Sequence, residues 1–115
     1  MAEATESSQA LRNLERLLAT GKDGALLRFG LGNEYLKGGD ANAAIVHLQR
    51  AGVIDPTYSA AWKLLGKALA AAHCEEAALE AWRDGVAAAE RRGDKQAMKE
   101  MQVFARRLAK QLGRE

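Results

Sequence analysis

Residues 61–85 read AWKLLGKALAAAHCEEAALEAWRDG, and a preceding part of the chain has the same pattern. Leu31-Gly32 and Leu65-Gly66 lie 34 residues apart, and so do Ala43-Ala44-Ile45 and Ala77-Ala78-Leu79. Two separate matches that share one offset indicate an internal repeat, and a period of roughly 20–50 residues is typical of stacked structural units.

The composition of each unit predicts a pair of helices. Ala and Leu dominate the chain, Val, Ile and Thr are scarce and there is a single Pro, so intrinsic preferences favour helix throughout. Gly and Ala let two helices approach closely, and large residues fill the remaining space. Gly38-Gly39-Asp40 predicts a turn with Asp40 as the next N-cap, and Asp55-Pro56 predicts a helix end.

This unit resembles the tetratricopeptide repeat, which has a period of about 34 residues and the pattern W-x2-L-G-x2-Y, A-x3-F, P. The matching residues are Arg28, Leu31, Gly32, Tyr35, Ala44, Leu48, Ala51 and Pro56 in the first unit, and Trp62, Leu65, Gly66, Leu69, Ala78 and Trp82 in the second. The departures are Arg28 for the first aromatic residue, Leu69 for Tyr, Gly85 for Ala, and Glu90 where Pro would close the second unit.

The repeat and its flanks predict one all-α domain over residues 1–115, an α-solenoid of two helix hairpins between two further helices. Shifted back by 34, the pattern places Ala10, Leu11 and Leu14 under Ala44, Ile45 and Leu48, so the N-terminal helix resembles the second helix of a truncated unit. Shifted forward, the match ends at Gly93-Asp94, and a capping helix is expected. The expected segments are an N-terminal helix at 6–20, repeat 1 at 25–58, repeat 2 at 59–92 and the capping helix at 94–112. Within the repeats, helices are expected near 24–37, 40–53, 57–72 and 75–92.

The resemblance implies a groove lined by the first helix of each unit. The implied peptide-binding residues are Leu26, Phe29, Asn33, Leu36 and Lys37 in the first unit, and Ala60, Lys63, Lys67 and Ala71 in the second. This lining would suit an extended or helical peptide of a partner protein, with apolar anchors and an acidic or C-terminal carboxylate group. Phe29 and Leu64 stand where repeats that clamp a terminal carboxylate have Lys and Asn. The alternative is that Lys63 and Lys67 are solvated helix charges.

The capping helix is predicted to be amphipathic and basic. Met98, Met101, Ala105, Leu108 and Leu112 recur at spacings of 3 and 4, which places them on one stripe. We expect this stripe to cover the last repeat; alternatively it could form the seam of a homodimer. The opposite face carries Lys95, Lys99, Arg106, Lys110 and Arg114, which leaves nucleic acid or another polyanion as a further alternative. Against nucleic acid, no reader motif is present and Phe104 is the only interleaved aromatic residue.

Charge is unevenly distributed along the chain. Residues 1–90 carry 9 Lys/Arg against 12 Asp/Glu, whereas residues 91–115 carry 8 against 3. Cys74 is the only cysteine, which excludes an internal disulfide and a multi-cysteine metal site. With no signal-peptide pattern and no apolar run long enough for a membrane span, we expect a cytoplasmic protein.

No residue pattern indicates catalysis, a cofactor or a metal site. His73-Cys74 pairs a possible base with a possible nucleophile, but neighbouring residues point apart and no Asp or Asn is placed to orient the histidine. We expect these two residues to end one helix and begin the next, as Gly39-Asp40 do one period before. His47 has no second ligand three or four residues away. The sequence therefore favours a non-enzymatic interaction module or scaffold without cofactor or metal.

Overall fold

The structure is a computed structural model that describes residues 2–114, with side chains described from Gln9 onward. The predicted all-α fold is confirmed: six helices and no strand are found in these residues. The helices are α1 (Ala2–Ala19), α2 (Ala25–Lys37), α3 (Ala41–Ile54), α4 (Ser59–Ala71), α5 (Glu75–Arg92) and α6 (Lys95–Gln111). The first helix begins before the expected residue 6, and the other bounds lie within two residues of expectation.

Local chemistry sets the ends of these helices. The Asp40 carboxylate accepts a hydrogen bond from the Ala43 amide at 3.1 Å, so Asp40 is the N-cap of α3 as expected. The helix ends at Ile54, and Asp55 before Pro56 is extended. The turn after α2 has Gly39 at φ 86°, and the turn after α4 has His73 at φ 63°. Both hairpins therefore turn through a left-handed residue at equivalent positions, but only the first uses glycine.

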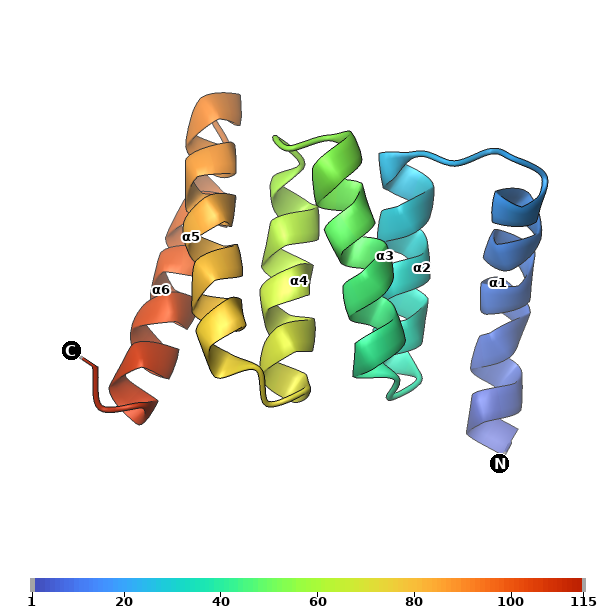
Figure 1. Ribbon diagram of the computed structural model, residues 1–115, viewed down its shortest axis with the longest axis horizontal. Helices are drawn as coiled ribbons and strands as arrows, with labels where there is room; N and C mark the ends of the chain where they lie inside the picture. The colour runs from blue at the N-terminus through green and yellow to red at the C-terminus, as the bar shows by residue number, and fades with distance from the viewer. Residues whose placement is uncertain (1, 115) are drawn as a thin grey trace.

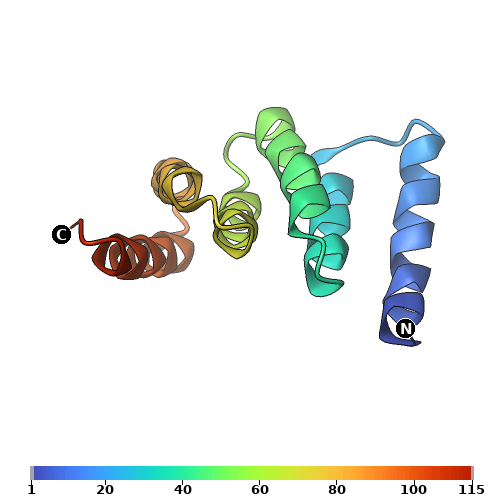
Figure 2. The same cartoon turned by 60° about the horizontal axis from the view of Figure 1, so that its bottom comes forward.

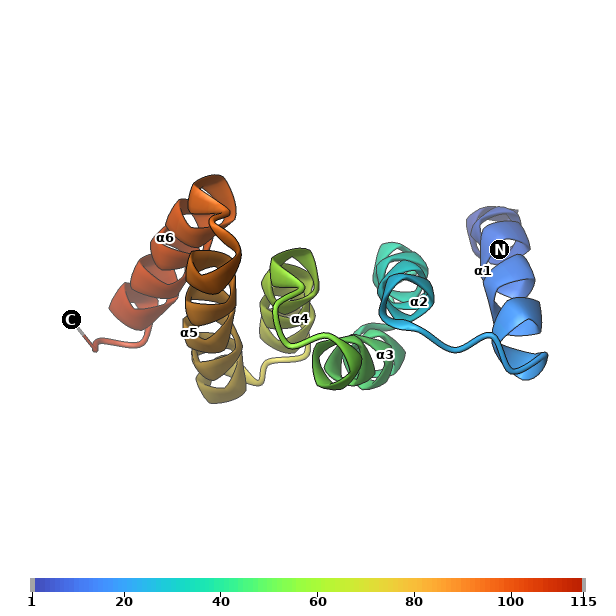
Figure 3. The same ribbon diagram turned by 90° about the horizontal axis from the view of Figure 1, so that it is seen from above.

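Successive helices are antiparallel neighbours, and the stack has two rows (Figures 1 and 2). The backbones of α2 and α4, and of α4 and α6, approach within 8 Å between Cα atoms, whereas within residues 2–114 those of α1 and α3, and of α3 and α5, do not. We call α2, α4 and α6 the inner row, and α1, α3 and α5 the outer row. Figure 3 shows α2 and α4 on one side of α3, with the two chain ends at opposite ends of the stack. Each inner-row helix therefore lies close to the next helix of its own row, whereas the outer-row helices lie further apart from one another. The inner-row face is the shorter side of the stack.

The two hairpins pack through equivalent crossing points. A Cβ added at Gly32 would overlap the Leu48 side chain, and a Cβ added at Gly66 would overlap the Trp82 indole. Leu48 and Trp82 are themselves 34 residues apart and buried. Each hairpin thus places a missing side chain against a large one, which lets the helices approach closely.

Helix α6 continues the repeat in a shifted register. Ala97 and Met101 are buried as Ala61 and Leu65 are, which gives an offset of 36 residues in place of 34. The shift arises because α5 has 18 residues and α3 has 14, while the loop that follows α5 is the shorter of the two. Pro56 follows α3 closely, whereas Glu90 at the equivalent place lets α5 continue. The capping helix therefore corresponds to the first helix of a third unit.

Candidate peptide-binding surface

The inner-row face brings charged and aromatic side chains of α4 and α6 together. Lys63 Nζ lies 2.7 Å from Glu100 Oε1, and the Lys67 ammonium lies 5.1 Å from the centre of the Phe104 ring. The first contact is an ion pair between partly exposed groups, and the second is a cation–π contact. The Lys63 ammonium lowers the pKa of the Glu100 carboxyl. These contacts position the two lysines where adjacent inner-row helices meet.

The aromatic residues of the first unit lie beside the start of the second. The Phe29 and Tyr58 rings are 5.3 Å apart at a tilt of 39°. Both rings are half-buried, and burial raises the pKa of the Tyr58 hydroxyl. This pair forms an apolar edge of the inner-row face. It lies at the N-terminal end of α4, and Lys63 belongs to the first turns of the same helix.

The other expected groove residues are placed less uniformly. Asn33, Leu36 and Ala60 are half-buried, and Leu36 packs against the core. Leu26 is 75% exposed, and Ala71 is exposed at the end of α4. Lys37 pairs with Glu34 of its own helix at 3.3 Å. These residues therefore differ in exposure, and a lining that they share with Lys63 and Lys67 stays a prediction.

The sequence pattern does not assign Tyr58, Glu100 or Phe104 to this face. Tyr58 precedes α4 at the junction of the two repeats, and the other two belong to the helix that follows the end of the match at Gly93-Asp94. The offset of 36 places Glu100 and Phe104 one residue after Lys99 and Val103, the counterparts of Lys63 and Lys67, and it gives no signal for Tyr58. That register depends on the length of α5, which the repeat pattern alone does not give.

The polar residues of the first hairpin form a network that ties the loop before α2 to α2 and α3. Arg28 makes two hydrogen bonds to Asp23 at 2.8 and 3.0 Å and donates to His47 Nδ1 at 3.1 Å. Because a guanidinium can only donate, His47 Nδ1 must accept, and the imidazole is neutral. Burial and then the Arg28 charge lower the pKa of His47. Arg28 stands where the repeat pattern has an aromatic residue, and here its side chain makes structural contacts with Asp23 and His47.

A second contact joins α1 to α2. The Tyr35 hydroxyl donates to Glu15 Oε2 at 2.5 Å, and its ring stacks on His47 at 5.4 Å. The Glu15 carboxylate, aided by burial, raises the pKa of Tyr35 to about 12. Tyr35 therefore contacts Glu15 of α1 and His47 of α3, and this cluster holds the N-terminal helix against the first repeat.

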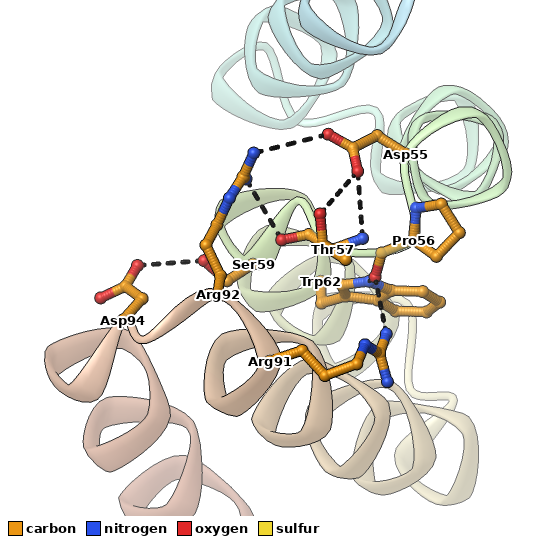
Figure 4. Close-up of polar contacts among 8 residues, drawn as sticks. All are labelled: Asp55, Pro56, Thr57, Ser59, Trp62, Arg91, Arg92 and Asp94. Atoms are coloured by element: carbon orange, nitrogen blue, oxygen red, sulfur yellow. Dashed lines mark hydrogen bonds and ion pairs between the residues drawn. The ribbon is translucent and has the colours of Figure 1, made fainter.

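Residues at the end of α5 and at the start of α6 form hydrogen bonds with the loop between α3 and α4 and with the first residue of α4 (Figure 4). Arg91 donates to the Pro56 carbonyl at 3.5 Å, and Arg92 donates to the Thr57 carbonyl at 3.2 Å. Ser59 Oγ donates to Asp94 Oδ2 at 3.0 Å. These bonds come from the last two residues of α5 and from the N-cap of α6. The departure from the repeat at the end of the second unit therefore has a structural consequence, because the extended α5 supplies the residues that fasten unit 2 to unit 1.

The apolar stripe of α6 is used inside the chain. Met101 and Leu108 are buried, Met98, Phe104 and Ala105 pack against the core, and Leu112 is exposed. The stripe therefore covers the last repeat, which leaves Met101 and Leu108 unavailable for a dimer seam. On the basic face, Lys95, Lys99, Arg106 and Lys110 are exposed, while Arg114 pairs with Glu76.

His73 and Cys74 occupy the turn between α4 and α5, as expected from Gly39 and Asp40. Cys74 is the N-cap residue of α5 without a side-chain cap, and its thiol faces the Ala72 carbonyl at 3.7 Å. His73 Nδ1 lies 3.9 Å from Glu75, with the histidine side chain 89% exposed. Among the described side chains of residues 9–114, no three metal-binding groups come together. No helix within residues 2–114 is long and apolar enough to cross a membrane.

Known proteins that are similar to this chain identify the family. No protein-family model matches the chain. The TPR repeat-containing protein PA0015 of Pseudomonas aeruginosa is 57% identical over 98 residues, which cover 85% of this chain and 93% of that protein. The solution structure of protein BPP2914 from Bordetella parapertussis is 50% identical, covers 88% of each chain and superposes with a TM-score of 0.76. Together with the 34-residue period and the two equivalent hairpins, this similarity places the chain in the tetratricopeptide-repeat family.

Proposed function

We propose that the chain binds a peptide segment of a partner protein on its inner-row face, and that it acts as a non-enzymatic adaptor. Repeats of this family serve generally as protein-interaction modules. The observation that carries the proposal is the meeting of α4 and α6, where Lys63, Lys67, Glu100 and Phe104 form one charged and aromatic surface. The sequence features of the chain offer no cofactor or catalytic alternative of comparable strength.

The contacts of the two lysines favour a ligand with an acidic group and an apolar anchor. Lys67 lies over a ring and makes no ion pair with a carboxylate of the described residues, so its ammonium can accept a ligand carboxylate without losing such a pair. Lys63 is already paired with Glu100, so a carboxylate there would have to compete with it. We therefore assign the main charge contact to Lys67 and the apolar contact to Phe29 and Tyr58.

A peptide-display experiment tests this assignment even with the partner unidentified. A random peptide library would be selected on the purified chain, and each enriched peptide would then be titrated against variants. Lys67→Glu and Phe29→Ala should each weaken binding about tenfold or more, because one reverses the charge contact and the other removes the apolar anchor. Lys110→Glu makes the same charge change on an exposed residue near the C-terminal end of α6, away from α4, and should bind as the wild type does.

Circular dichroism and thermal unfolding of each variant would show that the fold is retained. If every enriched peptide binds Lys67→Glu and Phe29→Ala as tightly as the unchanged chain, the inner row is not the binding surface. A selection that yields peptides dependent on these two residues, with an acidic residue near an apolar one, would support the proposal.

A further inference from the structure

A second surface lies at the C-terminal end of the stack, between α5 and α6. It is a groove of about 430 Å³ lined by Trp82, Arg83, Val86, Gln102, Ala105 and Arg106, which we call the end groove. These residues differ from those of the inner-row face, where α6 instead presents Glu100 and Phe104 to α4. The end groove is therefore a separate candidate binding surface.

The repeat register shows what the end groove would hold. Arg83 corresponds to Gln49 by the offset of 34, and Gln102 and Ala105 correspond to Gly66 and Leu69 by the offset of 36. One unit before, these positions hold a helix: Gly66 packs under Trp82 of α5, and Gln49 and Leu69 line a hollow together with Glu80 and Asp84 of α5. The end groove is thus the seat for an outer-row helix, and within residues 2–114 no helix follows α6.

The chemistry of this seat is apolar at the floor and cationic at the edges. Val86 and Ala105 are half-buried, whereas Arg83 and Arg106 are exposed. Neither guanidinium has a hydrogen bond or ion pair with any residue of the described chain. Gln102 stands at the place of Gly66, where the two hairpins have glycine and therefore no side chain. A helix that binds here must carry a small residue opposite Gln102.

The equivalent helix α5 indicates which residues suit the edge of the seat. It brings Glu80 and Asp84, four residues apart, to the hollow that contains Gln49. A helix bound in the same way at the end groove would bring residues at this spacing to Arg83, the counterpart of Gln49. Carboxylates there would meet an arginine in place of an amide, which strengthens the contact.

We propose that the end groove binds an amphipathic helix of a partner protein, with small apolar residues on one face and two carboxylates four residues apart on its edge. A second copy of this chain fits less well. Of its outer-row helices, α1 is the one that contacts a single neighbouring helix, but it carries Arg12 and Arg16 at the places of Glu80 and Asp84. Those cations would face Arg83, and like charges at this distance disfavour the complex.

The probe is a fluorescent 18-residue peptide with the sequence of α5, residues 75–92, stapled into a helix and changed by Trp82→Ala to fit opposite Gln102. A matched control peptide carries in addition Glu80→Lys and Asp84→Lys. Fluorescence anisotropy with the full chain should show binding of the first peptide, weaker at high salt, and an affinity about tenfold or more lower for the control.

Variants of the full chain locate the site. Arg83→Glu with Arg106→Glu should weaken binding of the acidic peptide about tenfold or more. Arg107→Glu changes an exposed arginine next to the groove but outside its lining, and it should leave binding unchanged. NMR amide shifts should centre on Val86 and Ala105.

Three results would overturn this proposal. The first is an acidic peptide that does not bind at low salt, and the second is one that binds the Arg83→Glu, Arg106→Glu variant as tightly as the unchanged chain. Sedimentation velocity of the chain alone gives the third: a concentration-dependent dimer that the double variant abolishes would assign the groove to a second copy. A monomer at all concentrations, together with the expected peptide affinities, supports a partner helix.

Discussion

Two glycines of α2 offer a sharp test of the helix crossing, because they lie two residues apart and differ in their surroundings. A Cβ at Gly32 would lie 2.7 Å from Leu48 Cδ2 and closer still to its Cγ, and Leu48 is fully buried. A Cβ at Gly30 would lie 3.5 Å from Leu14 Cδ1, which is ordinary contact. Gly30→Ala and Gly32→Ala therefore make the same chemical change, but only Gly32→Ala introduces a steric clash.

The expected free energies follow from two opposing effects. Replacing Gly by Ala inside a helix stabilises the fold by about 1 kcal/mol, and this gain applies to both variants. Overpacking a buried contact costs about 1–3 kcal/mol, and this cost applies only to Gly32→Ala. Because the helix preference cancels, the two variants should differ in free energy of unfolding by about 1–3 kcal/mol. At about 4 °C per kcal/mol for a chain of this size, Gly30→Ala should melt higher by several degrees.

Urea unfolding followed by circular dichroism measures both free energies, and a double variant gives the control. Leu48→Ala opens the space that a Cβ at Gly32 would fill, so Gly32→Ala should cost less in that background. If Gly32→Ala is as stable as Gly30→Ala, or if its cost persists without the Leu48 side chain, then close packing of α2 on α3 does not explain the glycine.

Three further predictions concern turns, caps and pH. His73→Gly should raise the free energy of unfolding by about 0.5–1 kcal/mol in urea titrations, because the left-handed residue would no longer carry a side chain; a loss of stability would contradict this. Burial and the neighbouring Arg28 charge hold the pKa of His47 below 6.5, so the unfolded chain binds the proton more readily and the melting temperature should fall as pH drops below 6.5. His47→Gln should reduce that slope, and an unchanged slope would exclude the histidine as its source. Asp94→Ala should lower the melting temperature more than Asp40→Ala, since both cap a helix but only Asp94 also accepts from α4; equal losses would show that the second bond contributes nothing.

The sequence by itself determined the repeat and its turns. The single offset of 34, the small residues at the crossing points and the turn residues Asp40 and Pro56 sufficed to predict six helices in two hairpins with flanking helices. This worked because hairpin packing is local: residues 16 apart, such as Gly32 and Leu48, meet across one turn. Even the replacement of Gly39 by His73 was placed correctly by the repeat, although its left-handed conformation was not evident from the residue.

Only the tertiary structure decided how the C-terminal third of the chain packs against the second repeat. The longer α5 moves α6 by two residues, and a shift of that size rotates a helix by about half a turn, so the sequence pattern could not tell which side chains of α6 face α4 and which face outward. Folding pairs Lys63 with Glu100, sets Lys67 over Phe104 and brings the exposed Arg83 and Arg106 to one groove between α5 and α6. Those contacts join residues far apart in the chain, and they depend on the length of a helix that no short motif encodes.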